Sequence, residues 1–310
     1  MKISFWKHHP HNDQSGKLLA HQSIELQAQF NFDFLKLTPA GNWLTTCYNI
    51  KDCNMEGDSL GRRMILEPGL RNKEDLQNIP DLDFNKGLLK EILTAAEISV
   101  AGSKAPVYAT IFCPLSQLIQ ACGMAFFLET AQTNAPLIHQ ALAKITSNTI
   151  AVLHAFKNRN VKGLFYVTQH MQPEILSEEL YRQFGLEADN STLKVASNLF
   201  DHILFHLHGE KVYACLPQHI PNLQVHVSSN SLDTEKYNTH GYPIIYGLSP
   251  QVLEEANNFE DIEVILSKLP SLDLITCDCV LPLDFPDDKI RLWCDYVGHL
   301  KVKSEGLMAV

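Results

Sequence analysis

The chain has 310 residues, of which 45% are hydrophobic and 19% are charged, and its formal net charge is −10 at pH 7. This apolar content can fill a large core, so the composition excludes an intrinsically disordered chain. The negative charge does not attract duplex nucleic acid or an anionic membrane, and we expect neither as a partner.

Membrane and export signals are missing from the sequence. No apolar run reaches the roughly 18 residues that span a bilayer, and the N-terminal residues lack the apolar segment and cleavage site of a signal peptide. The eight cysteines are dispersed and form no CxxC pair. We therefore expect a soluble, cytoplasmic protein whose cysteines are reduced.

Short apolar runs alternate with helical patterns along the chain. The runs predict strands at residues 2–6, 32–37, 106–112, 163–168, 203–208, 223–227, 242–247 and 272–277. Helical spacing predicts helices at residues 14–31, 84–99, 115–130, 136–158, 177–184, 192–202, 250–257 and 287–300. Residues 42–82 carry several Gly and Pro turn signals, so we expect a long irregular excursion there.

This alternation predicts the fold class. Strands separated by helices require parallel pairing with right-handed crossovers. Eight such units favour a closed (β/α)8 barrel of the TIM type, with residues 1–310 as one domain. Neither GxGxxG nor GxxxxGK[ST] occurs, which argues against the usual open sheets. An open doubly wound sheet remains the alternative.

A barrel of this type holds its active site at the C-terminal ends of its strands, and polar residues follow several predicted strands. We expect catalytic roles for Lys7, His11, Lys36 and Asp278. We expect substrate contacts from His8, His9, Gln169, His170 and Asn230. The basic and neutral donors of the segment KHHPHND suit an anionic or carboxylated small molecule, although the segment could also be a solvated loop.

Two i, i+2 pairs suggest a metal site. His206 and His208 end the fifth predicted strand, where alternate side chains point to the same side. Cys277 and Cys279 follow the same pattern at the eighth strand. Two imidazoles and a thiolate are ligands that zinc prefers, so we expect His206, His208 and Cys279 to bind zinc. The alternative is that the imidazoles bond to backbone groups and the cysteine only packs.

The order and spacing of several segments resemble the uroporphyrinogen decarboxylase superfamily. These segments are SFWKHHPHNDQ, DFLKLTPAGNW, IFCPLSQLIQACG, GLFYVTQHM with SEELYRQF, ILFHLHG, IIYGLSP and CDCVLP. The superfamily contains the decarboxylase, zinc-dependent corrinoid-linked methyltransferases and, more distantly, cobalamin-independent methionine synthase. The resemblance implies a (β/α)8 barrel.

The residues that the decarboxylase uses are largely replaced. Lys7 and His11 stand at two positions where the family has carboxylate-gripping arginines, and Lys36 stands at the position of an aspartate. The family tyrosine falls near Ile119 or Gln120, and its last histidine falls at Asp278. Because Lys36 reverses the charge that would stabilise a pyrrole cation, we do not expect decarboxylation of uroporphyrinogen itself.

The methyltransferase branch is matched at two of its three zinc-ligand positions. Its zinc ligands form an HxC pair at the fifth strand with a cysteine after the eighth. In this sequence His206 and Cys279 match, and His208 replaces the first cysteine. The resemblance implies zinc as cofactor and a corrinoid protein as partner, while the extra histidine makes the site less rich in thiolate.

Three functions remain open at this stage. The first is a decarboxylase-like lyase that acts on an acidic small molecule, the second is a zinc-dependent thiol methyltransferase, and the third is a barrel that binds a metabolite without catalysis. The resemblance also implies a homodimer. We expect Trp293 and Tyr296 of the last helix to be exposed at such an interface.

Overall fold

The computed structural model describes residues 1–230, 241–269 and 273–308. Its centre is a sheet of eight strands in the order β1-β10-β9-β8-β7-β6-β5-β2, with every pairing parallel. The strands are β1 (Lys2–Ser4), β2 (Leu35–Lys36), β5 (Val107–Phe112), β6 (Gly163–Thr168), β7 (His202–Leu207), β8 (Leu223–Ser228), β9 (Ile244–Leu248) and β10 (Leu274–Cys277). All eight expected strands are present, and the prediction of a (β/α)8 barrel is confirmed. Residue 272, at the start of the last expected strand, lies outside the described residues.

The two ends of this sheet, β1 and β2, are joined by a few individual hydrogen bonds rather than by a continuous strand ladder. Ser4 Oγ of β1 donates to the carbonyl of Phe34 and accepts from its N–H, and the Asp33 N–H donates to the carbonyl of Ile3 at 2.9 Å. These bonds join β1 to the residues that lead into β2. The result is a nearly closed barrel.

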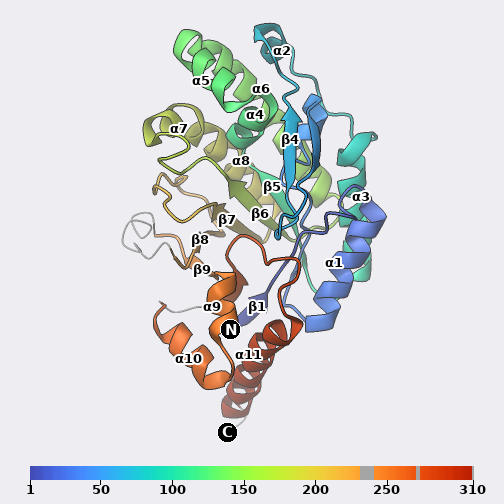
Figure 1. Ribbon diagram of the computed structural model, residues 1–310, viewed down its shortest axis with the longest axis vertical. Helices are drawn as coiled ribbons and strands as arrows, with labels where there is room; N and C mark the ends of the chain where they lie inside the picture. Colours follow the sequence, from blue (N-terminus) through green and yellow to red (C-terminus); the bar gives the residue numbers. More distant parts are fainter. Residues whose placement is uncertain (231–240, 270–272, 309–310) are drawn as a thin grey trace.

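Helices surround the strands and cover their outer face (Figure 1). They are α1 (Gly16–Phe30), α2 (Lys73–Gln77), α3 (Gly87–Gly102), α4 (Pro114–Cys122), α5 (Met124–Thr133), α6 (Ala135–Lys157), α7 (Glu178–Phe184), α8 (Leu186–Leu199), α9 (Pro250–Glu255), α10 (Phe259–Ser267) and α11 (Asp287–Met308). Several begin at a side-chain cap, for example Ser15, Ser177 and Ser249. Each cap satisfies a backbone N–H that the first helical turn leaves free.

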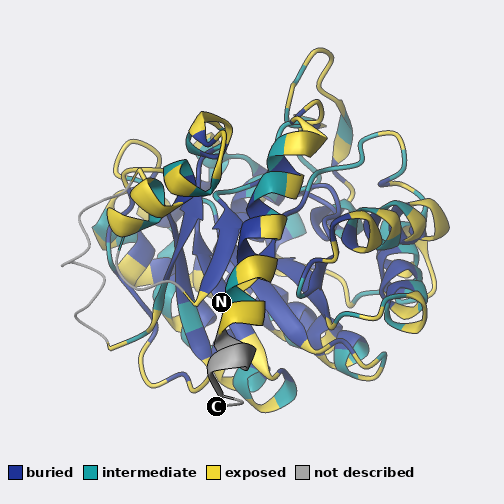
Figure 2. Ribbon diagram, turned by 90° about the horizontal axis from the view of Figure 1, so that it is seen from below, coloured by how far each residue is buried: buried dark blue, intermediate teal, exposed yellow. Residues whose placement is uncertain are grey.

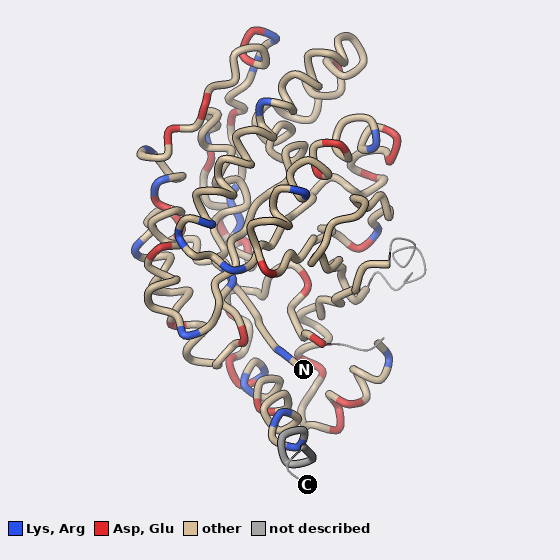
Figure 3. The backbone as a smooth tube through the Cα atoms, turned by 180° about the vertical axis from the view of Figure 1, so that it is seen from behind, with Lys and Arg blue, Asp and Glu red and all other residues tan. Residues whose placement is uncertain are grey.

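The distribution of burial and charge follows from this layering. Figure 2 shows buried strands at the centre and helices whose outer faces are exposed. Lys and Arg are interspersed with Asp and Glu along the outer helices and loops (Figure 3). Among the described residues, no helix is long and apolar enough to cross a membrane.

The excursion at residues 42–82 is more ordered than expected. It contains a 3-10 helix, η1 (Thr45–Tyr48), an antiparallel hairpin of β3 (Lys51–Asn54) and β4 (Arg63–Glu67), and the short helix α2. The strand β3 has the sequence KDCN, and Asp and Asn are poor strand formers. Because of this composition and a register shift between Lys51 and Asp52, the sequence pattern does not predict the hairpin.

The last helix does not expose the aromatic residues that were expected at a dimer interface. Trp293 is fully buried and its indole N–H donates to the carbonyl of Leu253 at 3.0 Å. Tyr296 is also buried and packs edge-on against Phe259. Both side chains attach α11 to α9 and α10 of the same chain, so the expectation of exposed aromatics is wrong. The homodimer itself stays a prediction.

A buried carboxyl group joins three elements behind the barrel wall. Asp189 of α8 is fully buried and accepts hydrogen bonds from the hydroxyls of Tyr166 in β6 and Tyr181 in α7. Burial raises the pKa of Asp189 to about 7, although the two tyrosine hydrogen bonds act in the opposite direction. The protonated form is therefore favoured in the folded chain relative to the unfolded one.

This shift predicts a pH dependence of stability. Between pH 4 and 7 (bounds taken from the unperturbed and raised pKa values), folding requires the Asp189 carboxyl to take up a proton, so stability falls as the pH rises through that window. Asp189→Asn removes this contribution. Relative to the variant, the wild type should lose on the order of 3 kcal/mol across the window, measured by urea unfolding at several pH values. Parallel pH curves for the two proteins would contradict the assignment.

Candidate functional site

A cavity of about 300 Å3 lies at the C-terminal ends of the strands. Its walls come from the ends of β2, β5, β6 and β7, from the residues after β10, and from the hairpin of β3 and β4. The polar residues that line it are His8, Lys36, Thr38, Asn42, Arg62, Arg63, Thr110, Gln120, Gln169, His206, His208 and Cys279. The hairpin therefore forms a wall of the cavity that the strand ends create.

Lys36 brings a buried positive charge to this cavity. Its Nζ lies 4.4 Å from the ring centroid of Phe165 and 5.0 Å from that of Trp6, and it donates to Thr38 Oγ1 at 3.3 Å. Burial lowers the pKa of Lys36 to about 8, while the thiols of Cys279 and Cys277 act in the opposite direction. The ammonium form still predominates at pH 7, and the two ring faces contribute to its stabilisation.

Two arginines of the hairpin also line the cavity, and each is paired with an aspartate, Arg62 with Asp58 and Arg63 with Asp52. Arg62 forms a bidentate pair with Asp58, with an Nη2–Oδ1 distance of 2.6 Å, and Arg63 lies beside it at the start of β4. Among the described residues that line the cavity, three are cationic and none carries a carboxylate. Because both arginines are paired with aspartates, the buried ammonium of Lys36 is the charge that makes the site suit an anionic ligand, even though the whole chain is acidic.

The three expected metal ligands lie together at one side of the cavity. One side-chain donor atom from each of His206, His208 and Cys279 lies within 4.8 Å of the other two. Cys279 Sγ is 3.3 Å from His208 Nδ1, and the rings of the two histidines have centroids 5.8 Å apart. Strand geometry explains this convergence, because the alternating side chains of β7 point to the same interior as the residues after β10.

A second buried histidine holds the first ligand. His206 Nδ1 lies 2.7 Å from Nδ1 of His226, and His226 Nε2 lies 2.9 Å from Thr276 Oγ1. Burial lowers the pKa of His226 to about 3 and, with the nearby imidazoles, lowers the pKa of His206 as well. Both rings are therefore neutral at pH 7, which is the form in which imidazole binds a metal.

The other ring nitrogen of His206 supports a metal site. His206 Nε2 is buried and has no hydrogen-bond partner among the described residues. An unpartnered buried nitrogen is costly unless another atom satisfies it. The combination of this nitrogen with an imidazole and a thiol matches the three-ligand arrangement of catalytic zinc sites, which keep one position open. The residues present therefore fit zinc.

The structure divides the expected site residues between two places. His8, Lys36 and Gln169 line the cavity with the three metal ligands. Lys7, His9 and His11 line a separate groove between the N-terminal loop and α1, and His8 lies at the boundary of both hollows. Lys7 Nζ donates to the backbone carbonyl of Phe285 at 2.9 Å. The sequence suggested that the whole N-terminal segment surrounds the cavity. In the structure the segment reaches the cavity through His8, and Lys7, His9 and His11 line the separate groove.

Three further expected residues lie beside the cavity without lining it. His170 Nδ1 is 3.0 Å from the buried Ser116 Oγ, and Asp278 hydrogen-bonds to Ser228. Burial raises the pKa of Asp278. Asn230 is exposed and donates to Glu210 Oε1 at 3.0 Å. Catalytic or substrate-binding roles for these residues stay predictions.

Sequence reasoning missed several residues that build the site. Arg62 and Arg63 lie in the excursion that was read as irregular, and Asn42 begins the same segment. His226 is a lone histidine within the apolar run LQVHV. A polar side chain in the middle of a buried strand requires a partner, and that requirement could have singled out His226.

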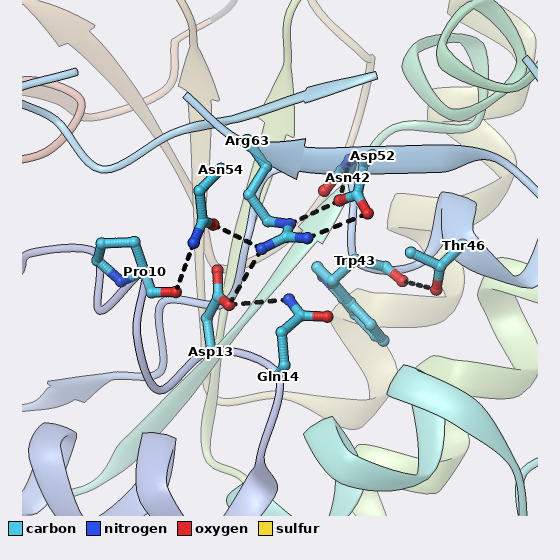
Figure 4. A network of polar contacts seen from close by, with 9 residues as sticks. All are labelled: Pro10, Asp13, Gln14, Asn42, Trp43, Thr46, Asp52, Asn54 and Arg63. Atoms are coloured by element: carbon cyan, nitrogen blue, oxygen red, sulfur yellow. Dashed lines mark hydrogen bonds and ion pairs between the residues drawn. The ribbon is translucent and has the colours of Figure 1, made fainter. Parts of the chain in front are cut away.

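Arg63 fixes the hairpin to the barrel (Figure 4). Its guanidinium forms two hydrogen bonds with Asp52, the shorter at 2.6 Å, and one with Asn54 Oδ1, also at 2.6 Å. It also lies 3.9 Å from Asp13, a fully buried carboxylate in the loop that follows β1. Asn54 in turn donates to the carbonyl of Pro10. One side chain therefore connects β3, β4 and the N-terminal loop.

We predict that Arg63→Met destabilises the hairpin and the whole chain. The substitution leaves the carboxylate of Asp13 buried without a cation, so the free energy of unfolding should fall by about 3 kcal/mol. Amide hydrogen exchange in β3 and β4 should accelerate more than exchange in the barrel strands. Lys51→Met on the same hairpin removes an exposed pair with Glu67 and should leave the stability nearly unchanged. Similar losses in both variants would contradict the role of Arg63.

Comparison with known proteins agrees with this architecture. The model of the uroporphyrinogen decarboxylase (URO-D) family matches residues 58–263. A solved methyltransferase from Methanosarcina mazei shares 13% sequence identity at a TM-score of 0.73, covering 94% of this chain and 88% of that one. A B12-independent methionine synthase from Shewanella sp. W3-18-1, in complex with selenomethionine, shares 8% identity at a TM-score of 0.57, covering 95% and 89%. No curated protein matches the chain. At such identities the two structures support the fold.

Proposed function

Because the chain belongs to the uroporphyrinogen decarboxylase family, we propose that it is a zinc-dependent methyltransferase that acts on a small anionic thiol. The observation that carries the proposal is the grouping of His206, His208 and Cys279 at the barrel mouth, together with the buried Nε2 of His206, which has no hydrogen-bond partner among the described residues. The cations of the same cavity supply the preference for an anion. The resemblance to methyltransferases in the overall fold agrees with this choice.

The proposed metal site has a defined set of ligands. His206, His208 and Cys279 would hold the ion, leaving one position for the substrate sulfur. When bound, zinc supplies a Lewis acid that keeps a thiol in its thiolate form near neutral pH. With two imidazoles and one thiolate as ligands, the site carries one more positive charge than a two-cysteine site, which favours an anionic fourth ligand.

The chain itself would orient the substrate and exclude water. Lys36 and Arg62 are positioned to bind the anionic end of the substrate, since both line the cavity. Lys36 is buried at that end, so water has restricted access to its ammonium and the electrostatic attraction is strengthened. A methylated corrinoid, which the resemblance implies as donor, would supply an electrophilic methyl group to the substrate sulfur and would retain the electron pair of its carbon–cobalt bond.

Decarboxylation of uroporphyrinogen receives less support from the site. That reaction would pass through a positively charged pyrrole that a carboxylate stabilises. The described lining of the cavity contains no carboxylate, and Lys36 places a cation there instead. A like charge at short range raises the barrier of such a step. The observed electrostatics therefore favour a substrate whose charge is negative throughout the reaction.

The metal hypothesis predicts about one zinc per chain in protein purified without a His tag. Cys279→Ala should lower the zinc affinity by about a hundredfold or more, because the only thiolate ligand is lost. Cys277→Ala is the matched control: Cys277 is buried two residues away, and its Sγ has only a long contact of 3.9 Å with the carbonyl of Trp6. Metal competition assays test both variants. Wild-type protein that stays metal-free with zinc supplied at pH 7 ends the proposal.

The substrate hypothesis predicts that the zinc-loaded protein binds 3-mercaptopropionate more tightly than propane-1-thiol of similar size. Arg62→Met should reduce this preference about tenfold, because a charge-assisted contact with the carboxylate is lost. Arg71→Met is the control, since Arg71 pairs with Glu67 and does not line the cavity. Isothermal titration calorimetry measures both ligands. Equal affinity of the wild type for the two thiols would contradict the anionic substrate.

A further inference from the structure

His206 and His226 face each other across two neighbouring strands. They are register partners in the parallel pair of β7 and β8, and their Nδ1 atoms lie 2.7 Å apart. His226 Nε2 then lies 2.9 Å from Thr276 Oγ1 of β10. The three residues form one buried hydrogen-bonded chain, because all of them are fully inaccessible to solvent.

The protons of this chain can be arranged in two directions. In the first, His206 Nδ1–H donates to His226 Nδ1, and His226 Nε2–H donates to Thr276 Oγ1. In the second, Thr276 donates to His226, His226 Nδ1–H donates to His206, and His206 carries its own proton on Nε2. Only the first direction leaves a lone pair on His206 Nε2, the buried atom without a partner. A metal ion can therefore bind only the first arrangement.

We propose that His226 is a positioning residue that fixes the tautomer and ring orientation of His206, so that the Nε2 lone pair is directed at the metal position. The inference rests on the proposed zinc site. Ligating histidines commonly donate their second N–H to a carboxylate or a carbonyl. In this chain the neutral imidazole of His226 accepts that hydrogen bond. His206 therefore gains no negative charge from its hydrogen-bond partner.

The residues around His226 leave little free space beside its ring. A Cβ atom at Gly247 of β9 would lie 2.9 Å from His226 Nε2, 2.7 Å from the carbonyl oxygen of Cys277 and 2.6 Å from Cα of Asp278. Glycine at this position thus leaves the space that the imidazole occupies. The rings of Trp6 and Phe165 lie on other sides, with centroids 6.1 and 5.5 Å from that of His226. Little room remains for water to replace the histidine.

A matched pair of substitutions tests the proposal. Asn has an oxygen close to the position of His226 Nδ1, whereas Leu has nearly the same shape without an acceptor. We expect His226→Leu to weaken zinc binding by about 10- to 100-fold and His226→Asn to weaken it much less. Competition with a chromogenic chelator measures the affinities, and the ligand-field spectrum of the cobalt-substituted proteins reports the ligand geometry. Equal affinities for the wild type and His226→Leu would overturn the inference while leaving the zinc site intact.

A second variant guards against misfolding of the first. Thr276→Val keeps the shape of the residue but removes the hydroxyl that accepts from His226 Nε2–H, leaving the backbone of Cys277 as the neighbouring partner, and it should weaken zinc binding several-fold. The 15N shifts of the His206 ring in the zinc-loaded wild type should correspond to a proton on Nδ1. A wild type that binds no zinc overturns the zinc site and the inference together. If zinc binds but Nδ1 of His206 carries no proton, the inference is overturned and the zinc site is retained.

Discussion

The parallel register of the barrel is the constraint on which the site depends. Because every strand of the ring runs in the same direction, the end of each strand opens on the same mouth. His206 and His226 are opposite each other only because β7 and β8 pair in the observed register. Thr276 is brought to His226 because β10 lies two strands further along the ring. A slip of one residue in any of these pairings would turn the imidazoles outward.

The sequence was sufficient to predict the barrel because its core strands are short, apolar and separated by regular helices. It also singled out His206, His208 and Cys279, since strand alternation places the first two on one side, and the structure brings the three side chains together. Their role as metal ligands stays a prediction. It could not find the hairpin, whose strand β3 contains Asp and Asn and is stabilised mainly by Arg63. The position of the N-terminal segment was equally out of reach. Whether Lys7 faces the cavity or the backbone carbonyl of Phe285 depends on tertiary contacts that no local pattern encodes.

Opposite electrostatic demands coexist in this molecule. The chain has a net charge of −10, yet the cavity concentrates Lys36, Arg62 and Arg63. The aromatic faces of Trp6 and Phe165 help to keep the lysine charged within a buried setting. The side chains of His206 and Cys279, by contrast, are neutral, because burial disfavours both the imidazolium and the thiolate forms. Burial thus keeps the imidazole and thiol groups neutral, whereas contacts with two aromatic rings help to keep Lys36 charged.

The hairpin belongs to a single continuous insertion between β2 and α3, whereas His206, His208 and Cys279 lie at or just after the ends of β7 and β10. The proposed metal ligands and the hairpin wall of the cavity are therefore encoded in separate stretches of the gene. Evolution can rewrite the insertion without disturbing the ring, so descendants of one ancestral barrel could exchange substrates while retaining the same three side chains. The same modularity offers protein engineers a segment that can be transplanted between relatives.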